Sequence, residues 1–529
     1  MMKVSSLEDF ENPLFDNRTT ASLIDNKLIY CNRENLHEET QPFAAYLRDF
    51  PVILITHDML ATRESVRTIG AGDLFLPVQD SVFKKIASVW REKGIIEAIR
   101  ATSAENPERI TPAIFWIASQ LTRVLDLVEK GTFQSEGLPI SGSGSIADIA
   151  NTRDWITALI RCISWHPHWT RLAVATRDDR IRIFSKDISG VAILKHNAQK
   201  TVCCMNWRPN CGRELAVACQ SGILIWTIEL GAASNSLSHA TLLKYKNHAP
   251  VTSVTWNPEG DLLVSSSLTD SNMIIWDVSR ESGIPLKRVG SGGLCFTRWS
   301  SCGSRLFSAT CRKVFRVWNI GTGTPWVPEK WTVSSGRVAA ACFGPNLTLL
   351  FASTEDPATV FSMPLEDHIF DVKTMGNFND SKVAVPLIDL SKFTFTNPDN
   401  DEEEVTIGGR VISMDWDPSG RYLAIIFQES PLVAVFTTKI GATSRITNVK
   451  AGCLIKGFAL EVPNCIQFYQ NHKKDSEAVC LTIAWSSGRI QHFPIVSHVE
   501  TQTDVCRNTT AFSSSVIGSP LYSSFSSYE

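Results

Sequence analysis

The chain has 529 residues, of which 43% are hydrophobic and 20% are charged, so it is too long for one hydrophobic core and too apolar to be disordered throughout. Lysine and arginine number 51 against 54 aspartate and glutamate residues, which gives a net charge of −3. With no global positive field, direct binding to nucleic acid or to an anionic membrane surface is not expected.

Cysteines and apolar runs bear on the cellular compartment. The 14 cysteines lie mostly in apolar runs, and no two of them form a C-x-x-C pair. We therefore expect reduced, buried thiols in a cytosolic or nuclear protein, with no metal and no other cofactor. The first residues lack the apolar core of a signal peptide, and no apolar run approaches the ~20 residues of a bilayer span, so neither secretion nor a membrane span is expected.

Three segments precede the main body of the chain. Residues 1–79 are expected to form an N-terminal extension that could donate a strand to the rest of the protein. Residues 80–131 carry apolar residues at three- and four-residue spacing, interrupted by Asn106-Pro107, which predicts two or three amphipathic helices. Residues 132–158 include the run GLPISGSGSIADIA and are predicted to be a flexible linker.

One pattern recurs from residue 159 to residue 496. An aromatic residue is followed two positions later by proline, then by a polar turn, a Leu-Ala-like strand, a second turn, and an alternating strand that ends on an aromatic residue. The clearest copies are CISWHPHWTRLAVATRDDRIRIF, CMNWRPNCGRELAVACQSGILIW and SVTWNPEGDLLVSSSLTDSNMIIWD. The aromatic residues that begin the seven copies are Trp165, Trp207, Trp256, Trp299, Phe343, Trp416 and Phe468. Further structural anchors are Trp226, Trp276, Trp318, Phe436 and Trp485.

The spacing of these copies predicts a mainly β protein, a seven-bladed propeller. Five of the six gaps between successive anchors are 42 to 52 residues, close to the ~40 to 45 of four-stranded propeller blades. The sixth gap, from Phe343 to Trp416, is 73 residues. We assign its excess to a polar insertion at residues 366–408, which contains NPDNDEEEV and is read as a solvated loop or as a site for a basic partner.

The physical basis of the repeat is the alternation of side chains between two sheet faces. In five of the seven copies proline ends the first strand because it cannot donate a ladder hydrogen bond, and the following turn closes a hairpin. One such sheet cannot bury both of its faces, whereas seven packed radially bury nearly all of them. The last blade still needs a fourth strand, for which Lys27–Cys31, residues 52–56 and residues 496–502 are candidates, and we favour an N-terminal donor.

His166-Pro167-His168 is the most site-like run in the repeats. Zinc needs three or four ligands, and these two histidines have no cysteine or carboxylate partner at a recognised spacing. Other copies carry Arg-Pro-Asn, Asn-Pro-Glu or Asp-Pro-Ser at this place, which indicates a turn. We expect His166→Ala and His168→Ala to leave folding nearly intact. Hydrolase-elbow, zincin and kinase signatures do not occur, so no catalytic residue is predicted.

The end of the chain differs in composition. Residues 497–529 are rich in serine and poor in charge, and we expect a disordered tail. Ser519-Pro520 within it is a candidate phosphorylation site for a proline-directed kinase.

The repeats resemble the WD40 family of propellers. In that family a Trp-Asp pair closes a blade, and Trp276-Asp277 matches it. Asp270, six residues before the tryptophan, and His248, further upstream, resemble the structural hydrogen-bond network of the family. In other copies the network is eroded, since Gln220 replaces the aspartate before Trp226. The resemblance implies a divergent propeller held mostly by apolar packing.

A narrower resemblance covers about residues 80–495. The runs ELAVACQSGILIWTI, VFRVWNI, SMDWDPSGRYLAI and AWSSGRIQHFPI, with the helical WREKGIIEAI, resemble the aladin family of WD-repeat nucleoporins. That resemblance implies a non-enzymatic scaffold of the nuclear pore complex that supports nucleocytoplasmic transport. It further implies a peripheral position at the nuclear envelope, through a transmembrane nucleoporin and other pore components, and a link to the mitotic spindle and its poles.

Two alternatives remain open at this point. One is a propeller enzyme, such as a hydrolase, with its site in the central channel, and the other is a WD40 adaptor of another complex. Titratable residues converging in the channel would favour the enzyme, whereas small apolar groups there would disfavour it.

Overall fold

A computed structural model provides the structure of the chain. It describes residues 4–33, 44–60 without residue 49, and 143–497 with gaps at 187–189, 230–237, 289–291, 322–325, 357, 366–383, 399, 442–445 and 470–477. Between residues 61 and 142 it describes only positions 99, 102, 116 and 118–122, all of them helical. The rest of the predicted helical segment at 80–131, the tail and Ser519 lie outside the described residues.

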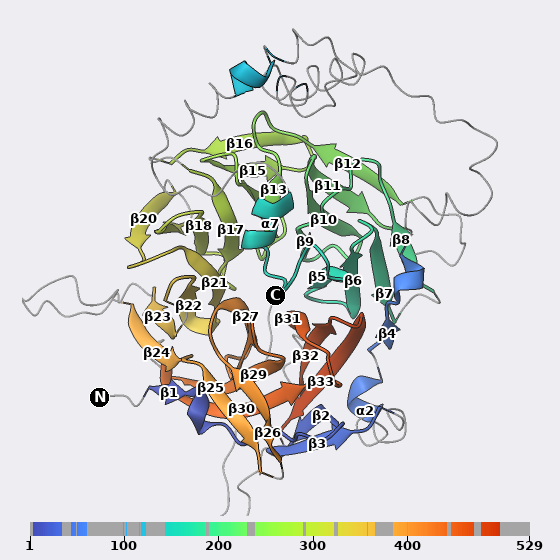
Figure 1. Ribbon diagram of the computed structural model, residues 1–529. Coiled ribbons are helices and arrows are strands. Elements are labelled where there is room, and N and C mark those ends of the chain that lie inside the picture. Colours follow the sequence, from blue (N-terminus) through green and yellow to red (C-terminus); the bar gives the residue numbers. More distant parts are fainter. Residues whose placement is uncertain are drawn as a thin grey trace, which may run out of the picture.

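Seven antiparallel sheets, numbered here as blades 1 to 7 in chain order, form a closed ring around a central axis (Figure 1). Blade 1 comprises β5 (Ile160–Trp165), β6 (Arg171–Thr176), β7 (Ile181–Ser185) and β8 (Ala192–Leu194). Blade 2 comprises β9 (Cys204–Trp207), β10 (Glu214–Cys219), β11 (Gly222–Thr227) and β12 (His239–Leu243). Blade 3 comprises β13 (Val251–Trp256), β14 (Leu263–Ser267), β15 (Met273–Asp277) and β16 (Ser282–Leu286).

The second half of the ring repeats the arrangement with additions. Blade 4 comprises β17 (Leu294–Trp299), β18 (Arg305–Thr310), β19 (Val314–Asn319) and β20 (Val327–Thr332). Blade 5 comprises β21 (Val338–Phe343), β22 (Thr348–Ser353), β23 (Thr359–Pro364) and β24 (Val385–Asp389). Blade 6 comprises β27 (Val411–Trp416), β28 (Tyr422–Phe427), β29 (Leu432–Ile440) and β30 (Ile446–Lys456). Blade 7 comprises β31 (Pro463–Phe468), β32 (Ala478–Trp485) and β33 (Arg489–Val496). The prediction of a seven-bladed propeller is confirmed.

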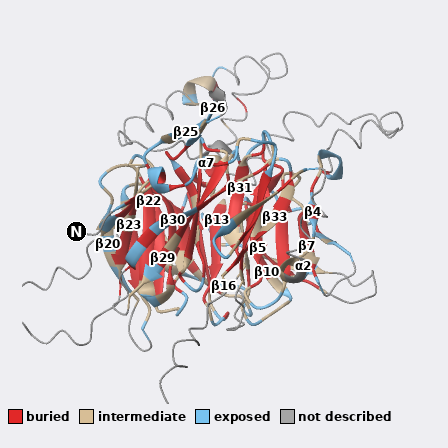
Figure 2. Cartoon of the chain, turned by 90° about the horizontal axis from the view of Figure 1, so that it is seen from below, coloured by how far each residue is buried: buried red, intermediate tan, exposed pale blue. Residues whose placement is uncertain are grey.

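Burial explains why these segments are strands. The second strand of a blade is buried along its whole length, as in Arg171–Thr176 and Tyr422–Phe427, because both of its faces are covered by neighbouring blades. The outer strands, such as Ser282–Leu286, alternate between half-buried and exposed positions. Figure 2 shows the buried residues running through the inner strands of the disc, while exposed residues gather at loops and margins. The hydrophobic cores lie between blades, which is how one sheet stabilises the next.

The first two strands share a local irregularity in six of the seven blades. Their pairing shifts register near the start of the first strand, for example between Ile160 and Cys162 and between Leu294 and Phe296. In each of these blades one residue of the first strand is therefore left bulging from the ladder near the axis. Cys295 is the bulged residue of blade 4.

Blade 7 is completed from the N-terminus. Strand β2 (Thr19–Ile24) pairs in parallel with the end of β33, and β3 (Lys27–Cys31) pairs with β2. Strand β4 (Ile53–Leu54) pairs antiparallel with the beginning of β33. Two of the strands considered from the sequence are therefore found in this sheet. Lys27–Cys31 pairs with β2 and does not contact β33, whereas residues 52–56 include β4, which does.

The same N-terminal segment crosses blades 5 and 6 before it reaches blade 7 (Figure 1). Strand β1 (Ser5–Ser6) pairs in parallel with β24 at the outer edge of blade 5, and the short 3₁₀ helix η1 (Leu7–Asp9) follows it. Phe10 packs edge-on against Phe436 of blade 6, with ring centroids 5.0 Å apart. The Thr19 hydroxyl donates to the carbonyl of Lys456 at 2.6 Å. Residues 4–31, called the belt below, thus connect three consecutive blades.

The region predicted as an insertion contains two kinds of structure. Strand β24 is the outer strand of blade 5, so residues 385–389 belong to the propeller and the insertion is shorter than expected. The acidic run lies on a two-stranded hairpin, β25 (Phe393–Asn397) and β26 (Asn400–Ile407). This hairpin stands on the face of the disc that carries the short helix α7 (Ser143–Ile149) (Figure 2).

Two further short elements are α2 (Ala44–Leu47) and the 3₁₀ helix η3 (His57–Met59). Among the residues that the structure describes, no helix is long and apolar enough to cross a membrane.

Candidate functional site

The predicted aromatic anchors occupy equivalent positions in the ring. Six of them end the first strands of blades 1 to 6, namely Trp165, Trp207, Trp256, Trp299, Phe343 and Trp416. Four lie on third strands, namely Trp226, Trp276, Trp318 and Phe436, and Trp485 ends the second strand of blade 7. All are buried except Trp299 and Phe343, which are half-buried. Their shared place at the seams between blades gives them a packing role.

His248, Asp270 and Trp276 are brought together in blade 3 by a fourth residue, Ser265. The Nδ1 atom of His248 donates to Asp270 Oδ2 at 3.0 Å, and its Nε2 atom accepts from the Ser265 hydroxyl at 2.8 Å. Trp276 Nε1 donates to the same hydroxyl oxygen at 2.8 Å. Burial lowers the pKa of His248, which keeps the ring neutral at pH 7 despite its bond to Asp270. The chain of bonds fixes β14 and β15 to the loop before β13 and to the turn between β14 and β15.

A second chain of hydrogen bonds closes the seam between blades 7 and 1. Trp165 Nε1 donates to the Thr482 hydroxyl at 2.9 Å, and this hydroxyl lies 3.1 Å from His492 Nδ1. His492 Nε2 donates to the carbonyl of Pro51 at 3.0 Å. Phe50 packs edge-on against Trp165, with ring centroids 5.7 Å apart. The first anchor of the repeat series is thereby held by the last blade and by the N-terminal segment.

Polar side chains along the channel bond neighbouring blades to each other. In four places a side chain of one first strand accepts a hydrogen bond from a backbone N–H of the next first strand. The pairs are Asn206 Oδ1 with Trp256 N at 2.9 Å, Ser253 Oγ with Thr297 N at 3.2 Å, Asp415 Oδ2 with Phe468 N at 2.6 Å, and Gln467 Oε1 with Trp165 N at 2.9 Å. Burial raises the pKa of Asp415 to about 7, although the Phe468 bond opposes this. These groups have structural partners within the ring.

The channel itself is a cavity of about 580 Å³. Its walls carry many small, apolar or thiol-bearing side chains from the first strands, among them Cys162, Cys204, Val254, Met414 and Ile466. Burial holds the pKa of the Cys162 thiol well above its usual range, so the thiol stays protonated. Among the residues that the structure describes, no group of three or more His, Cys, Asp or Glu side chains could hold a metal ion. The lining also includes titratable side chains, among them Asp415, Asp417 and Arg298, and Asp415 is bonded to the next blade through Phe468 N.

One mouth of the channel is spanned by residues 143–158, called the brace below. They comprise α7 and the segment that leads into β5, and the sequence had assigned them to a flexible linker. Ile146, Ile149 and Trp155 are buried in one cluster with apolar side chains of blades 4 and 5. On the opposite side, Arg153 N donates to the carbonyl of Asn464 at 2.9 Å. Tertiary contacts therefore order a segment that belongs to the predicted flexible linker.

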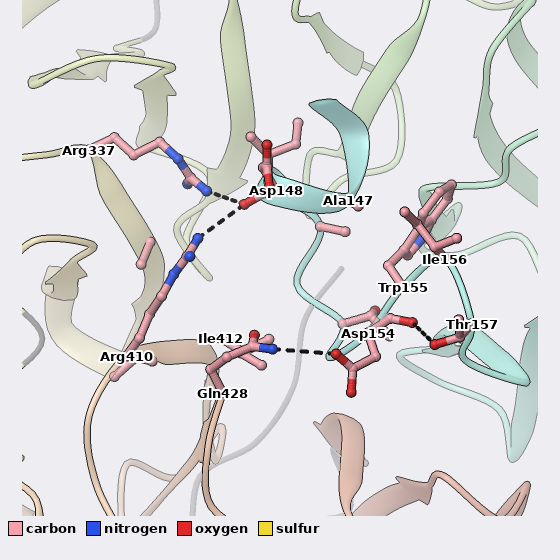
Figure 3. A pocket seen from close by; sticks show the side chains of 15 residues that line it. Ala147, Asp148, Asp154, Trp155, Ile156, Thr157, Arg337, Arg410, Ile412 and Gln428 are labelled. Carbon is pink, nitrogen blue, oxygen red and sulfur yellow. Dashed lines mark hydrogen bonds between the residues drawn. The ribbon is translucent and has the colours of Figure 1, made fainter. Parts of the chain in front are cut away.

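Arginines from blades 5 and 6 hold the C-terminal end of α7 (Figure 3). Arg337 and Arg410 both donate to the carbonyl of Asp148, the latter at 3.3 Å. Positive groups at a helix C-terminus interact favourably with its unsatisfied carbonyls. Gln428 Nε2 donates to Asp154 Oδ1 at 3.5 Å, and a pocket of about 510 Å³ lies among these side chains. The brace, its arginines and this pocket form the candidate functional site.

His166 has a larger part in the fold than the sequence indicated. Its ring is fully buried, and Nδ1 accepts from the backbone N–H groups of His168 at 3.0 Å and Trp169 at 3.3 Å. Its Nε2 atom lies 3.3 Å from the carbonyl of Cys211 in the next blade. Burial lowers the pKa of His166 to about 4. The ring orders a turn, as expected from the sequence, but we no longer expect His166→Ala to be neutral.

Several structural residues escaped the sequence reasoning. Ser265 lies in a run of three serines and was not recognised. Its place on β14, the second strand after His248, could have indicated it in the WD40 pattern. His492, Thr482 and Pro51 come from distant parts of the chain and share no motif. For Arg337 and Arg410 no sequence signal was available, because their partner is a backbone carbonyl.

Comparisons with known proteins agree with this architecture. Residues 141–496 match the family described as the Aladin seven-bladed propeller, so the match includes the brace as well as the ring. A protein named Aladin from Arabidopsis thaliana is 26% identical to the chain over 410 residues, which are 70% of this chain and 86% of that protein.

Proposed function

Because the chain belongs to the aladin family of seven-bladed propellers, we propose that it is a non-enzymatic scaffold of the nuclear pore complex. The observation that carries the proposal is the family match, which spans about two thirds of the chain and runs from the brace to the last blade. Family and fold together support a nucleoporin-like scaffold. A pore component of this kind works by holding partners in place.

The channel geometry agrees with this role. Its polar side chains hold neighbouring blades together, as Asp415 does with Phe468, and a brace with buried anchors spans one mouth. Recognition is then left to the loops and margins of a rigid disc, where binding residues are usually found. The proposed activity is therefore protein binding by preformed surfaces, which avoids the entropy cost of ordering a loop on association.

The finer proposal concerns position and partners. We propose that the protein sits peripherally at the nuclear envelope, bound to a transmembrane nucleoporin and to other pore components, and that it supports nucleocytoplasmic transport. In mitosis the same surfaces would serve the spindle and its poles. The supporting observations are the family match and the lack of a membrane-spanning helix among the described residues.

The brace face offers exposed apolar side chains for such docking. Ile156, which lines the pocket at the brace, is 52% exposed, and Leu460, in the turn between blades 6 and 7, is 99% exposed. A large apolar side chain in solvent is a natural anchor for a protein partner. On the outer strands, Ile193 and Ile284 are exposed to a similar degree, at 52% and 64%, and provide a matched comparison.

Localisation in cells tests the proposal. A fluorescently tagged chain replaces the native protein, and the ratio of nuclear-rim to cytoplasmic fluorescence is measured. The wild-type protein is expected to concentrate at the rim. The variant Ile156→Asp/Leu460→Asp should lose the rim signal, whereas Ile193→Asp/Ile284→Asp should keep it. Thermal melts of the purified variants establish that both remain folded.

The possible outcomes separate the ideas. A wild-type protein spread evenly through the cytoplasm would refute the pore proposal and favour an adaptor of another complex. Rim localisation that survives Ile156→Asp/Leu460→Asp but not Ile193→Asp/Ile284→Asp would move the docking surface to the outer strands.

A further inference from the structure

Two cysteine sulfur atoms lie next to each other beneath the brace, in blade 4. Cys295 is the bulged residue of β17, and Cys311 directly follows β18. Their Sγ atoms are 3.5 Å apart, with the Cys295 thiol directed at the sulfur of Cys311. The backbones are also tied together, because Cys311 N donates to the carbonyl of Gly293 at 3.1 Å. The fold therefore keeps the two thiols side by side.

The two thiols have different surroundings. Cys295 is 1% exposed and packs in the same cluster as Ile146 and Ile149 of the brace. Cys311 is only half-buried at the turn between β18 and β19 (Val314–Asn319). A small oxidant can therefore reach Cys311 more readily than Cys295.

Positive charge is gathered around Cys311. The hydrogen bond from Cys295 lowers the pKa of the Cys311 thiol, and the guanidinium groups of Arg337 and Arg288 lower it further against the opposing effect of burial. Both arginines are held in place by backbone carbonyls, Arg337 by those of Val338 and Asp148. Because carbonyls carry no net charge, they position the guanidinium groups without neutralising them. Thiolate formation is favoured at Cys311 and disfavoured at buried Cys295.

We propose that Cys311 and Cys295 form a modification site, a thiol pair that a hydroperoxide converts to an intramolecular disulfide. The Cys311 thiolate attacks one oxygen of hydrogen peroxide, the O–O bond breaks, and the departing hydroxide takes up a proton to leave as water. Cys311 is then a sulfenic acid. The Cys295 sulfur attacks the Cys311 sulfur, the S–O bond breaks, and a second water leaves with the Cys295 proton. Two thiols and one peroxide thus give one disulfide and two waters.

Cys302 supplies a matched control on the same blade. It is exposed, and its sulfur lies 3.4 Å from the Ser300 hydroxyl and 2.9 Å from that of Ser304. These hydrogen bonds lower its pKa although desolvation opposes them. Peroxide can oxidise this thiol as well, but its neighbours are serine hydroxyls, which cannot form a disulfide with it. The pair and the control therefore differ in whether a second thiol is in place.

The experiment uses the purified, reduced full-length chain and stoichiometric hydrogen peroxide, followed by N-ethylmaleimide and non-reducing trypsin digestion. Cleavage after Arg288, Arg298, Arg305 and Arg312 places the pair in separate peptides, residues 289–298 and 306–312, with Cys302 in a third. Mass spectrometry is expected to find the first two peptides joined, with the loss of two hydrogens. Dithiothreitol should release them, and Cys302→Ser should leave the yield unchanged.

Variants of the pair test the assigned roles. Cys295→Ala should let the Cys311 sulfenic acid accumulate, where dimedone traps it, and Cys311→Ser should leave Cys295 reduced in the folded protein. Urea should abolish the preferential linkage of the two peptides, because it disperses the neighbouring thiol. Failure of the linked peptides to form while Cys302 is oxidised would overturn the proposal. Unchanged oxidation of Cys295 in folded Cys311→Ser would overturn the order of attack.

Discussion

Lowering the pH from 7 to 5 is expected to destabilise the protein through His166. The ring is neutral in the folded state because Nδ1 accepts two backbone N–H groups, from His168 and Trp169, and a proton there would remove both bonds. Burial lowers its pKa to about 4 from the ordinary value of 6.5. Since the folded pKa of this base is depressed, its contribution is complete above pH 6.5 and is lost as the pH falls toward 4.

The size of the effect follows from the two pKa values. At pH 5 the unfolded ring is almost fully protonated while the folded ring is almost fully neutral, which costs about 2 kcal/mol of the free energy of unfolding relative to pH 7. Asp415 acts in the opposite direction, because a raised carboxyl pKa of about 7 stabilises the folded state as the pH falls. Burial also lowers the pKa of His492 to about 4, so the wild-type curve alone mixes the contributions of several buried groups.

A matched variant isolates the histidine. Asn257 stands in blade 3 at the place of His166, and its Oδ1 accepts from Asp261 N and Leu262 N at 3.0 Å each. His166→Asn therefore keeps an acceptor at the turn but cannot titrate. Urea unfolding followed by tryptophan fluorescence at pH 7 and pH 5 should show the wild type losing about 2 kcal/mol more than the variant. An equal loss in both proteins would refute the assignment of a neutral, buried ring to His166.

Three further substitutions test the blade interior, the hydrogen-bond network and the belt. Ala424→Pro removes a ladder donor from the fully buried β28 and should lower the free energy of unfolding by about 3 kcal/mol or more. We expect the variant to lose its cooperative thermal transition and its rim localisation, and a melt like that of the wild type would contradict this. Ser265→Ala leaves a buried histidine and a buried tryptophan without their shared partner and should cost about 2 kcal/mol in urea unfolding, while Ser266→Ala, whose hydroxyl makes no hydrogen bond, should be nearly neutral. Leu7→Ala, in the belt, should lower the free energy of unfolding by about 2 to 5 kcal/mol, because Leu7 is fully buried. Val4 is exposed, so Val4→Ala should have a much smaller effect. Equal melting points for the two variants would show that the belt does not support the ring.

The blades could be predicted because each one carries its own local signature. An aromatic residue, a proline and a turn mark the end of one strand within a few residues, and alternation marks the next, as in the run from Trp165 to Phe184. Trp276, Asp270 and His248 could likewise be recognised, since the spacing of the WD40 pattern relates them directly. Signals of this kind depend on short stretches of chain and survive divergence of the rest.

An N-terminal strand donor was expected from the sequence, but the path of the belt across three blades and the order of the brace could not be predicted because long-range contacts determine them. Strand β2 meets β33 through only two residue pairs, Leu23 with Ile495 and Ile24 with Val496, and parallel pairing at an edge requires no particular sequence. The brace is part of the segment 132–158 that was predicted to be a flexible linker, and its order comes from side chains buried against blades 4 and 5. Strand β24 was missed for a similar reason, since it follows a long interruption in the repeat.

Closure of the ring and occupation of its channel are physically connected. A propeller has one seam where the first and last blades meet. Here the N-terminal segment covers that seam, because Phe50 packs on Trp165 of blade 1 and Pro51 accepts a hydrogen bond from His492 of blade 7. The brace then bonds to blades 5, 6 and 7 from the start of blade 1, so that opening the seam would also disturb the channel mouth. The axis and the seam of the disc are therefore tied by the same N-terminal half of the chain. Contacts that tie the blades to one another in this way keep the surfaces of the disc at fixed spacing, which is what the proposed scaffold role requires.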